Sequence, residues 1–497
     1  MEEDDLQEEF NRLIEVRMEK LRQQIARGEV PYAYSYQRTA TVAWVREHFA
    51  DAGHEPSADS VRLAGRIMVV RDHGKSCFMD LKDMSGTLQL YGSINDLGDS
   101  YSRFLEVDAG DILGVEGAVF RTRKGELTLR VKDFTPLAKS LRPLPEKYHG
   151  LKDPEIRYRM RYLDLIVNDE SMQTFVTRSK FISSMRRWLD SRGFLEVETP
   201  ILTPIAGGAL ARPFKTYFNF LEQEFYLRIA TELYLKRLIV GGMEKVYEIG
   251  KDFRNEDMDT THNPEFTMME LYHAFADYTD MMDLTEHMLS NCIKETCGTL
   301  KFTYGDATID FSGPWKRMSM LQAIHDVGEI DINDFKDKGE LLTTASRLRL
   351  ENITPEMDAG QLLSEIFDQR VQRLLVSPTI IYDHPASISP LAKKSRRDSF
   401  FAERFECFIN GMEIANAFSE LNNPLEQKEN FEKQAARREA GDREAHPYDK
   451  DYVTALEYGL PPTGGLGVGI DRIVMLISGA QSIKDVMLFP QMRRKEE

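Results

Sequence analysis

The stretch Val246–Tyr272, VYEIGKDFRNEDMDTTHNPEFTMMELY, combines two apolar runs with an unusual number of charged side chains. The runs Val246–Phe253 and Phe266–Phe275 predict two antiparallel β-strands joined by a short polar loop. On such strands, residues two apart project to the same face, as Glu270 and Tyr272 would. Charged side chains on a shared inner face make a poor core but a suitable floor for a charged ligand. A salt-bridged surface hairpin is the alternative interpretation.

Two further stretches carry chemistry of the same kind. Glu406–Glu420, ECFINGMEIANAFSE, places carboxylates in an apolar context, where they are costly unless paired with a cation or a metal. Carboxylate oxygens suit Mg²⁺, which binds beside substrate phosphates. We expect a strand over Phe408–Phe418. The alternative interpretation is that these carboxylates lie on the solvent-exposed face of that half-exposed strand. In Gly464–Leu476, GGLGVGIDRIVML, glycines would let the backbone approach a flat ligand, and Arg472 would point at it from the next helix.

Together these stretches describe an ATP site without a phosphate-binding loop of the GxxxxGK[ST] type, which the chain lacks. Two arginines would bind phosphate, two carboxylates would hold Mg²⁺, and a phenylalanine would cover an adenine face. The carboxylates left over are Glu232, Glu270 and Glu420. An acidic pocket beside an ATP site implies a small cationic co-substrate. This expectation fails if the three carboxylates face apart, or are already neutralised by the protein's own lysines and arginines.

The sequence around these stretches predicts an α+β domain. Helices are expected over Phe175–Arg192, Tyr226–Leu238, Asp277–Cys297 and, for the most part, Met318–Val376. Because the helices come in blocks and do not alternate strictly with strands, an antiparallel sheet flanked by helices is favoured over a doubly wound parallel sheet.

The N-terminal part of the chain has a different periodicity. Short strands with period-two alternation are expected over five ranges, Val61–Val70, Ser76–Leu81, Thr87–Tyr91, Ile112–Thr122 and Leu127–Phe134. Five strands with a longer connection around Ile94–Leu105 favour a small barrel of the oligonucleotide-binding (OB) type over an immunoglobulin-like sandwich. Two helices are expected before the barrel, over Asp5–Glu29 and Thr39–Phe49.

These patterns divide the chain into four segments. We expect a helical extension over residues 1–59, the OB-type barrel over 60–140, a linker over 141–165 and the α+β domain over 166–497. Within the last segment, residues 278–375 form a mostly helical insertion.

The composition of the chain excludes several classes of protein. Of 497 residues, 42% are hydrophobic and 29% are charged, which is typical of a globular protein. No apolar run approaches the length of a membrane span, and the acidic start lacks the features of a signal or transit peptide. Four scattered cysteines indicate neither a disulfide framework nor a paired zinc motif. A net charge of −17 argues against nonspecific coating of nucleic acid, although local patches can still bind it. We expect a cytoplasmic protein that does not bind membranes.

Three motifs in the appropriate order give the chain a resemblance to class II lysyl-tRNA synthetases over nearly its whole length. Arg192–Pro200, RGFLEVETP, is similar to motif 1 of that family, which lies at a homodimer interface. Phe253–Glu270 resembles motif 2, and Gly465–Arg472 with the helix that follows resembles motif 3. The stretch His262–Thr267, followed by Glu270–Tyr272, is closer to the lysyl type than to the aspartyl or asparaginyl relatives.

The resemblance implies an aminoacyl-tRNA ligase. Such an enzyme activates lysine with ATP to lysyl-adenylate and pyrophosphate, and then transfers lysine to the 3′ end of tRNA(Lys). The resemblance also implies Mg²⁺ as the cofactor, a homodimer, and a barrel that reads the anticodon.

Carried over residue by residue, the resemblance also implies the site residues. Arg254 and Arg472 are the implied catalytic residues. The implied ATP site consists of Arg254, Asn255, Glu256, His262, Asn263, Phe266, Glu413, Gly469 and Arg472. The implied lysine pocket consists of Gly208, Glu232, Glu270, Tyr272, Asn416 and Glu420, and the implied metal ligands are Glu406 and Glu413. In the barrel, the anticodon-reading positions correspond to Arg66, Phe78 and Gln89, although Phe78 is equally well interpreted as an aromatic residue of the barrel core.

Two other functions stay open on the sequence alone. One is a synthetase of the same subclass that activates aspartate or asparagine, whose pocket should hold cationic residues in place of Glu232 and Glu420. The other is a non-catalytic paralogue that binds nucleic acid. Such a protein should have lost Arg254, Arg472 or a metal carboxylate, and all of these are present.

Overall fold

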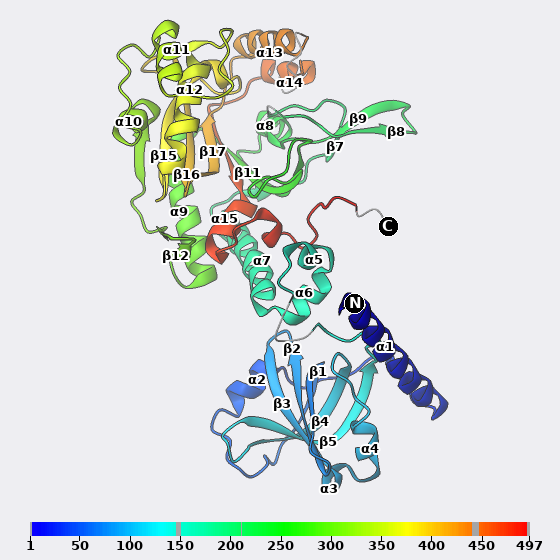
Figure 1. The fold of residues 1–497 in the computed structure, drawn as a ribbon. Coiled ribbons are helices and arrows are strands. Elements are labelled where there is room, and N and C mark those ends of the chain that lie inside the picture. Colours follow the sequence, from blue (N-terminus) through cyan, green and yellow to red (C-terminus); the bar gives the residue numbers. More distant parts are fainter. Residues whose placement is uncertain (1, 146–150, 210, 440–446, 495–497) are drawn as a thin grey trace. The chain divides into compact units, whose positions relative to one another are not determined.

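A computed structural model of the protein describes residues 2–145, 151–209, 211–439 and 447–494 (Figure 1). The chain forms two compact units, residues 1–150 and residues 151–497. Part of the predicted linker, residues 146–150, lies outside the described residues. Within the described ranges, no helix combines the length and the apolar character needed to cross a membrane.

The first unit is built around a closed five-stranded barrel (Figure 1). Its strands are β1 (Ser60–Asp72), β2 (Ser76–Asp83), β3 (Gly86–Ser93), β4 (Ile112–Arg121) and β5 (Leu127–Ala138). They pair in the order β1-β2-β3-β5-β4, and antiparallel pairing of β1 with β4 closes the barrel. The connection from β3 to β4 contains α3 (Ile94–Leu97), the 3-10 turn η1 (Gly98–Ser100) and α4 (Tyr101–Phe104). The predicted OB-type barrel is therefore confirmed.

Two helices precede the barrel, as predicted: α1 (Glu2–Ala26) and α2 (Val42–His48). Arg17 of α1 donates hydrogen bonds to the backbone carbonyls of Ala109 at 2.9 Å and of Ser140 and Arg142 at 3.0 Å each. These bonds attach the long helix to the barrel unit.

The second unit centres on an eight-stranded sheet in the order β14-β15-β16-β17-β18-β11-β10-β6. In chain order, its strands are β6 (Leu195–Glu196), β10 (Lys245–Phe253), β11 (Glu265–Ala274), β14 (Lys316–Ser319), β15 (Thr379–Pro385), β16 (Phe401–Ile409), β17 (Met412–Ser419) and β18 (Thr463–Gly469). Strands β15 to β10 of this order are mutually antiparallel, as predicted, whereas β14 and β6 pair in parallel at the two edges. Smaller sheets are formed by β7 (Leu202–Thr203), β8 (Lys215–Phe218) and β9 (Gln223–Leu227), and by β12 (Lys301–Tyr304) and β13 (Ala307–Asp310).

Helices flank the large sheet (Figure 1). One face packs against α7 (Asp169–Asp190), α9 (Tyr278–Cys297) and α15 (Ile470–Ser478), which together with the sheet form the largest apolar core. A second core lies among α10 (Met320–Asp326), α11 (Lys338–Arg347), α12 (Ala359–Arg370) and β15, and a third among α8 (Glu232–Val240), α13 (Pro424–Glu439) and α14 (Lys450–Glu457). The remaining helical segments are α5 (Pro154–Arg159), α6 (Arg161–Val167), η2 (Gln372–Leu374), η3 (Ala386–Ile388) and η4 (Ile483–Val486).

Two sequence predictions were wrong in detail. The single strand expected over Phe408–Phe418 is a hairpin of β16 and β17, because Asn410 and Gly411 adopt φ angles of 50° and 71° and turn the chain. The helix expected over Tyr226–Leu238 begins only at Glu232. Its predicted first residues instead complete β9, which pairs with β8.

Candidate active site

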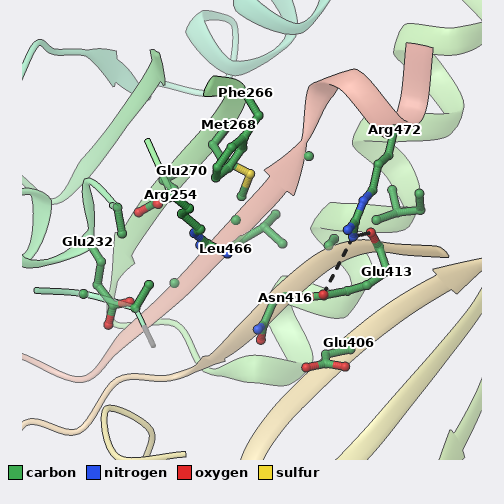
Figure 2. Close-up of a pocket in the computed structure, with 18 of the residues that line it drawn as sticks. Glu232, Arg254, Phe266, Met268, Glu270, Glu406, Glu413, Asn416, Leu466 and Arg472 are labelled. Atoms are coloured by element: carbon green, nitrogen blue, oxygen red, sulfur yellow. Dashed lines mark hydrogen bonds and ion pairs between the residues drawn. The ribbon is translucent and has the colours of Figure 1, made fainter. Parts of the chain in front are cut away.

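A cavity of about 430 Å³ lies over strands β11, β17 and β18 (Figure 2). The period-two alternation of β11 explains its position. Met269 and Leu271 are buried in the core on one face of the sheet, whereas Met268, Glu270 and Tyr272 line the cavity. Alternate residues of β11 therefore face the core on one side of the sheet and the cavity on the other.

The glycine-rich strand β18 lies between β11 and β17 and forms part of the cavity floor. A Cβ atom at Gly465 would overlap Oε1 of Glu420 and lie 2.7 Å from Cε1 of Tyr272. These two side chains therefore reach across β18 because Gly465 has no side chain. At Gly465 the space is thus filled by side chains of the protein and is not open to a flat ligand, whereas a Cβ atom at Gly469, which lines the cavity, would lie no closer than 3.8 Å to the atoms around it.

Three carboxylates converge at one end of the cavity. Glu232 begins α8, Glu270 lies on β11 and Glu420 follows β17. All three line the cavity, and their exposed fractions are 7%, 7% and 1%. The hydroxyl of Tyr272 is within 3.4 Å of Oε2 of Glu270, to which it donates a hydrogen bond. The three carboxylates are close enough to repel one another.

A cation of the protein lies among these carboxylates, and this corrects the expectation of an un-neutralised acidic pocket. Nζ of Lys236 is 2.5 Å from Oε1 of Glu232 and also contacts Glu420, and the lysine is fully buried. Three carboxylates against one ammonium leave a formal charge of −2 when all are ionised. Glu270 forms no ion pair with any described residue, so Lys236 balances at most one of the three negative charges.

Burial shifts the proton equilibria of this cluster. It raises the pKa of Glu270 to about 8, and the nearby carboxylates of Asp252 and Glu232 add to the shift. Burial also raises the pKa of Glu232 and of Glu420, and Lys236 opposes both shifts. Burial would lower the pKa of Lys236, but Glu232 and Glu420 outweigh it and raise that pKa well above its usual value. Lys236 is therefore charged at neutral pH, and Glu270 carries a proton below about pH 8 in the free protein.

Among the described residues, three arginines line the cavity, Arg254, Arg404 and Arg472, of which Figure 2 shows Arg254 and Arg472. Arg254 directly follows β10, and its guanidinium carbon lies 5.1 Å from the ring centre of Phe266. It forms no ion pair in the described part of the chain, and its buried Nε has no hydrogen-bond partner there. Arg472, in the first turn of α15, donates to the backbone carbonyl of Glu413 at 2.6 Å and to Nε2 of His262 at 3.0 Å. Arg254 is thus a cation available to an anionic ligand.

Two more carboxylates, Glu406 and Glu413, line the cavity on the side of Arg472 (Figure 2). Glu406 is paired with Arg404 at 2.5 Å, and Glu413 lies 3.8 Å from Arg472. Burial raises the pKa of Glu413, and repulsion from Glu406 adds to the shift. Mutually repelling carboxylates fit a divalent cation with oxygen ligands. No metal-binding group of three or more His, Cys, Asp or Glu side chains occurs within the described ranges, so a bound Mg²⁺ would also need oxygens from phosphate or water.

The barrel carries a separate set of polar and aromatic side chains on its outer face. Phe78 alternates with the buried Cys77 and Met79 and is itself half-exposed, so it projects outward from β2 and not into the core. Its ring lies 5.1 Å from that of Tyr91. On β3, Oε1 of Gln89 accepts a hydrogen bond from Thr128 at 3.0 Å. Arg66 of β1 is half-buried and donates to the carbonyl of Gly110 at 2.7 Å.

Comparisons with known proteins agree over both units. Residues 153–493 match a family described as tRNA synthetases class II (D, K and N), and residues 61–137 match an OB-fold nucleic acid binding domain. A lysine–tRNA ligase of Carboxydothermus hydrogenoformans is 50% identical over 490 residues, covering 98% of this chain and 99% of that protein. Lysine–tRNA ligases of Moorella thermoacetica and Halalkalibacterium halodurans are each 51% identical, over 488 and 495 residues, with 98% of this chain and 99% and 98% of those proteins covered. The chain belongs to the class II lysine–tRNA ligase family.

The cavity of this family member brings together nearly all of the site residues suggested by the sequence. Those lining it are Gly208, Glu232, Arg254, Glu256, His262, Asn263, Phe266, Glu270, Tyr272, Glu406, Glu413, Asn416, Glu420, Gly469 and Arg472. Asn255 is the exception. It is exposed, lies beyond the end of β10 and does not line the cavity.

Sequence reasoning missed several charged residues near the cavity, among them Lys236 and Arg404. Lys236 is four residues after Glu232, and this spacing on a helix is a recognisable signal for an ion pair. Arg404 precedes Glu406 by two residues on β16, so the two project to the same face, and its Nε donates to Oδ1 of Asn416 at 3.1 Å. The sequence spacing of Lys236 from Glu232 and of Arg404 from Glu406 could have predicted both ion pairs once the two carboxylates were identified as site residues.

Proposed function

We propose that the cavity activates lysine with ATP and that the protein then transfers lysine to the 3′ end of tRNA(Lys). The distribution of charges along the cavity carries this proposal. Figure 2 shows Glu232 and Glu270 towards one end and Arg472 with Glu413 and Glu406 towards the other. Glu420 belongs to the first group because it shares Lys236 with Glu232, and Arg254 has no ion pair with a described residue. The ammonium groups of lysine fit the first end, its carboxylate fits Arg254, and the ATP phosphates fit the arginines. In this proposal, the lysine pocket consists of Gly208, Glu232, Glu270, Tyr272, Asn416 and Glu420.

The first step needs no general base. The lysine carboxylate is already an anion, and it attacks the α-phosphate of ATP while pyrophosphate leaves. Arg254 would stabilise the negative charge that builds up around the phosphorus, and Arg472 would stabilise the leaving phosphates. Fixing two substrates in reacting geometry can supply roughly 7–11 kcal/mol of the barrier. In this proposal, the chain contributes to catalysis by positioning the two substrates and by stabilising negative charge with its arginines.

The same geometry supports the nucleotide part of the proposal. Phe266 would cover one face of the adenine, with Glu256 at its edge and Gly469 beneath the nucleotide, while His262 and Asn263 would approach the phosphates. Glu406 and Glu413 would hold Mg²⁺, which supplies positive charge to the phosphates when bound.

Pyrophosphate exchange with each of the twenty amino acids tests the proposed function. Lysine is expected to support exchange far better than any other amino acid. Exchange that depends on aspartate or asparagine would indicate the related subclass, and no exchange with any amino acid would indicate a non-catalytic nucleic-acid-binding protein. ATP binding alone does not separate these outcomes.

The KM for lysine is expected to fall as the pH rises towards 8. Glu270 has its pKa raised to about 8, so below that pH lysine must displace a proton to bind there. The KM should fall about tenfold per pH unit and level off above the pKa. Steady-state exchange kinetics between about pH 6 and 9 measure this dependence. Glu270→Gln should remove it, whereas a wild-type KM that does not change with pH would contradict the assignment.

Phe78→Ala is expected to impair charging of tRNA and to spare adenylate formation. The outward-facing ring of Phe78 is proposed to stack on an anticodon base, with Arg66 and Gln89 contacting the same loop. Loss of such stacking costs about 1–3 kcal/mol, roughly a 5- to 150-fold rise in the KM for tRNA. Aminoacylation and pyrophosphate exchange measured on the same preparation separate the two effects.

The control for this variant is Tyr34→Ala, which removes another exposed aromatic side chain from the first unit. It should leave both activities unchanged. If Phe78→Ala lowered pyrophosphate exchange as far as aminoacylation, the proposed division of labour between the two units would be wrong.

We also propose that the protein acts as a homodimer through the segment resembling motif 1. Strand β6 forms one edge of the large sheet and is only two residues long. Leu195 on this strand and Ile201 and Leu202 just beyond it are 53%, 47% and 48% exposed. Exposed apolar side chains beside a sheet edge favour contact with another chain.

A cytoplasmic location fits the cysteines. All four are free thiols, and Cys77, Cys292 and Cys407 are buried. Burial raises the pKa of Cys77 and of Cys292 to about 11, which keeps these thiols protonated. Free, unreactive thiols are typical of proteins of reducing compartments.

A further inference from the structure

Lys236 lies behind the carboxylates of the cavity. It is fully buried, which is rare for a lysine unless it is paired. Its Nζ contacts Glu232 and Glu420, both of which line the cavity, whereas Lys236 itself does not. Three aromatic rings surround the ammonium at 5.5–6.0 Å, those of Phe418, Tyr452 and Tyr272. The ammonium is therefore placed to act on the two carboxylates and not on the substrate.

Lys236 opposes the protonation of Glu232 and Glu420: burial raises the pKa of both carboxylates, and the ammonium lowers it. Glu232, Glu270 and Glu420 repel one another at close range and are buried, and each of these effects favours the protonated form. Among the described residues, the other charged or titratable groups that act on the three carboxylates are Asp252, Arg404, Tyr272 and Tyr452, and of these Arg404 is the cation. Arg404 is already paired with Glu406.

We propose that Lys236 is a positioning residue that keeps Glu232 and Glu420 ionised and oriented towards the substrate. This inference rests on the proposed function. The three carboxylates are then balanced by three ammonium groups, one from Lys236 and two from the substrate lysine. A neutral amino acid of similar length supplies one ammonium only, and leaves one buried carboxylate unpaired, which is costly. Lys236 thus determines how many positive charges the substrate must supply to balance the three carboxylates.

A purely structural ion pair would have a different consequence. Its loss would lower the stability of the fold but would leave the number of protons displaced by lysine unchanged. If Lys236 holds the two carboxylates ionised, its removal forces lysine to displace a further proton, in addition to the proton on Glu270. The pH dependence of lysine binding therefore distinguishes the two roles.

The test is Lys236→Met in the full chain, with the KM for lysine measured by pyrophosphate exchange between about pH 6.5 and 8.5. The wild-type KM should fall about tenfold per pH unit below pH 8, and that of the variant up to about a hundredfold. At pH 7 the KM for lysine should be raised about tenfold or more, with the KM for ATP unchanged. Equal slopes in the two proteins would overturn the inference.

Two further comparisons complete the test. Arg237→Met removes the next cation of α8, which pairs with Asp449 at 3.0 Å and Asp451 at 3.1 Å, and it should keep the wild-type slope. If Lys236→Met does not fold, Glu232→Gln is compared with the double variant Glu232→Gln/Lys236→Met, which buries no added net charge. The steeper slope should appear in the double variant only, and equal slopes there overturn the inference. Absence of lysine-dependent exchange in the wild type would instead overturn the proposed function.

Discussion

Replacing Arg254 with methionine is expected to lower the rate of lysine-dependent pyrophosphate exchange by about a thousandfold. In the proposed geometry, this guanidinium contacts both the lysine carboxylate and the α-phosphate, so its loss removes the cation shared by the two reacting anions. Removal of one such stabilising donor typically costs about 100- to 1,000-fold, and Arg254 is the cavity arginine that no carboxylate of the described chain already occupies. Pre-steady-state adenylate formation measures the effect on the chemical step directly.

Methionine keeps an unbranched apolar stem and removes the guanidinium group, which lies over the ring of Phe266. The control is Arg347→Met on α11, where an exposed arginine is replaced at a distance from the cavity lining. It should leave the exchange rate unchanged. A mere rise in the KM for tRNA, with normal adenylate formation by Arg254→Met, would remove Arg254 from the catalytic step and leave Arg472 as the principal stabilising cation.

Much of the fold follows from local pattern. The five barrel strands and the long helices α7 and α9 have strong periodicity, and their existence was predictable from spacing alone. The hairpin of β16 and β17 was missed although its Asn410-Gly411 turn is a strong short-range signal, because the apolar run on both sides reads as continuous. The parallel pairing of β6 and β14 at the sheet edges depends on partners distant in the sequence, and no local pattern indicates it.

The site was predictable in its residues but not in its electrostatics. Strand alternation explains why Glu270 and Tyr272 share the cavity, whereas Asn255 lies beyond the end of β10, where alternation no longer applies. The position of Lys236 behind Glu420 depends on the packing of α8 against the end of β17, which brings together residues 184 positions apart. The raised pKa of Glu270 likewise arises from burial, a property of the folded chain and not of the local sequence.

Glu420→Gln is expected to raise the KM for lysine about a hundredfold and to leave ATP binding nearly intact. A carboxylate about 4 Å from an ammonium is worth about 4 kcal/mol at an effective dielectric constant of 20. Lys236 already shares this carboxylate, so the expected loss is nearer to that of one charge-assisted hydrogen bond, about 1.5–3 kcal/mol. Lysine-dependent exchange kinetics measure the KM for lysine, and calorimetric titration measures the affinity for ATP.

The matched control is Glu426→Gln, which removes a half-exposed carboxylate that pairs with Lys394 at 2.8 Å outside the acidic end of the cavity. It should change neither constant. In Glu420→Gln, Glu232 would be the one remaining carboxylate partner of Lys236 among the described residues. The pocket would then hold one carboxylate fewer for the substrate to balance. The variant should therefore bind methionine, which has one ammonium group, relatively better than the wild type does. An equal loss of lysine and ATP binding would mean that Glu420 supports the cavity as a whole. The preference for a cation would then have to come from Glu270, the pocket carboxylate that no ion pair to a described residue satisfies.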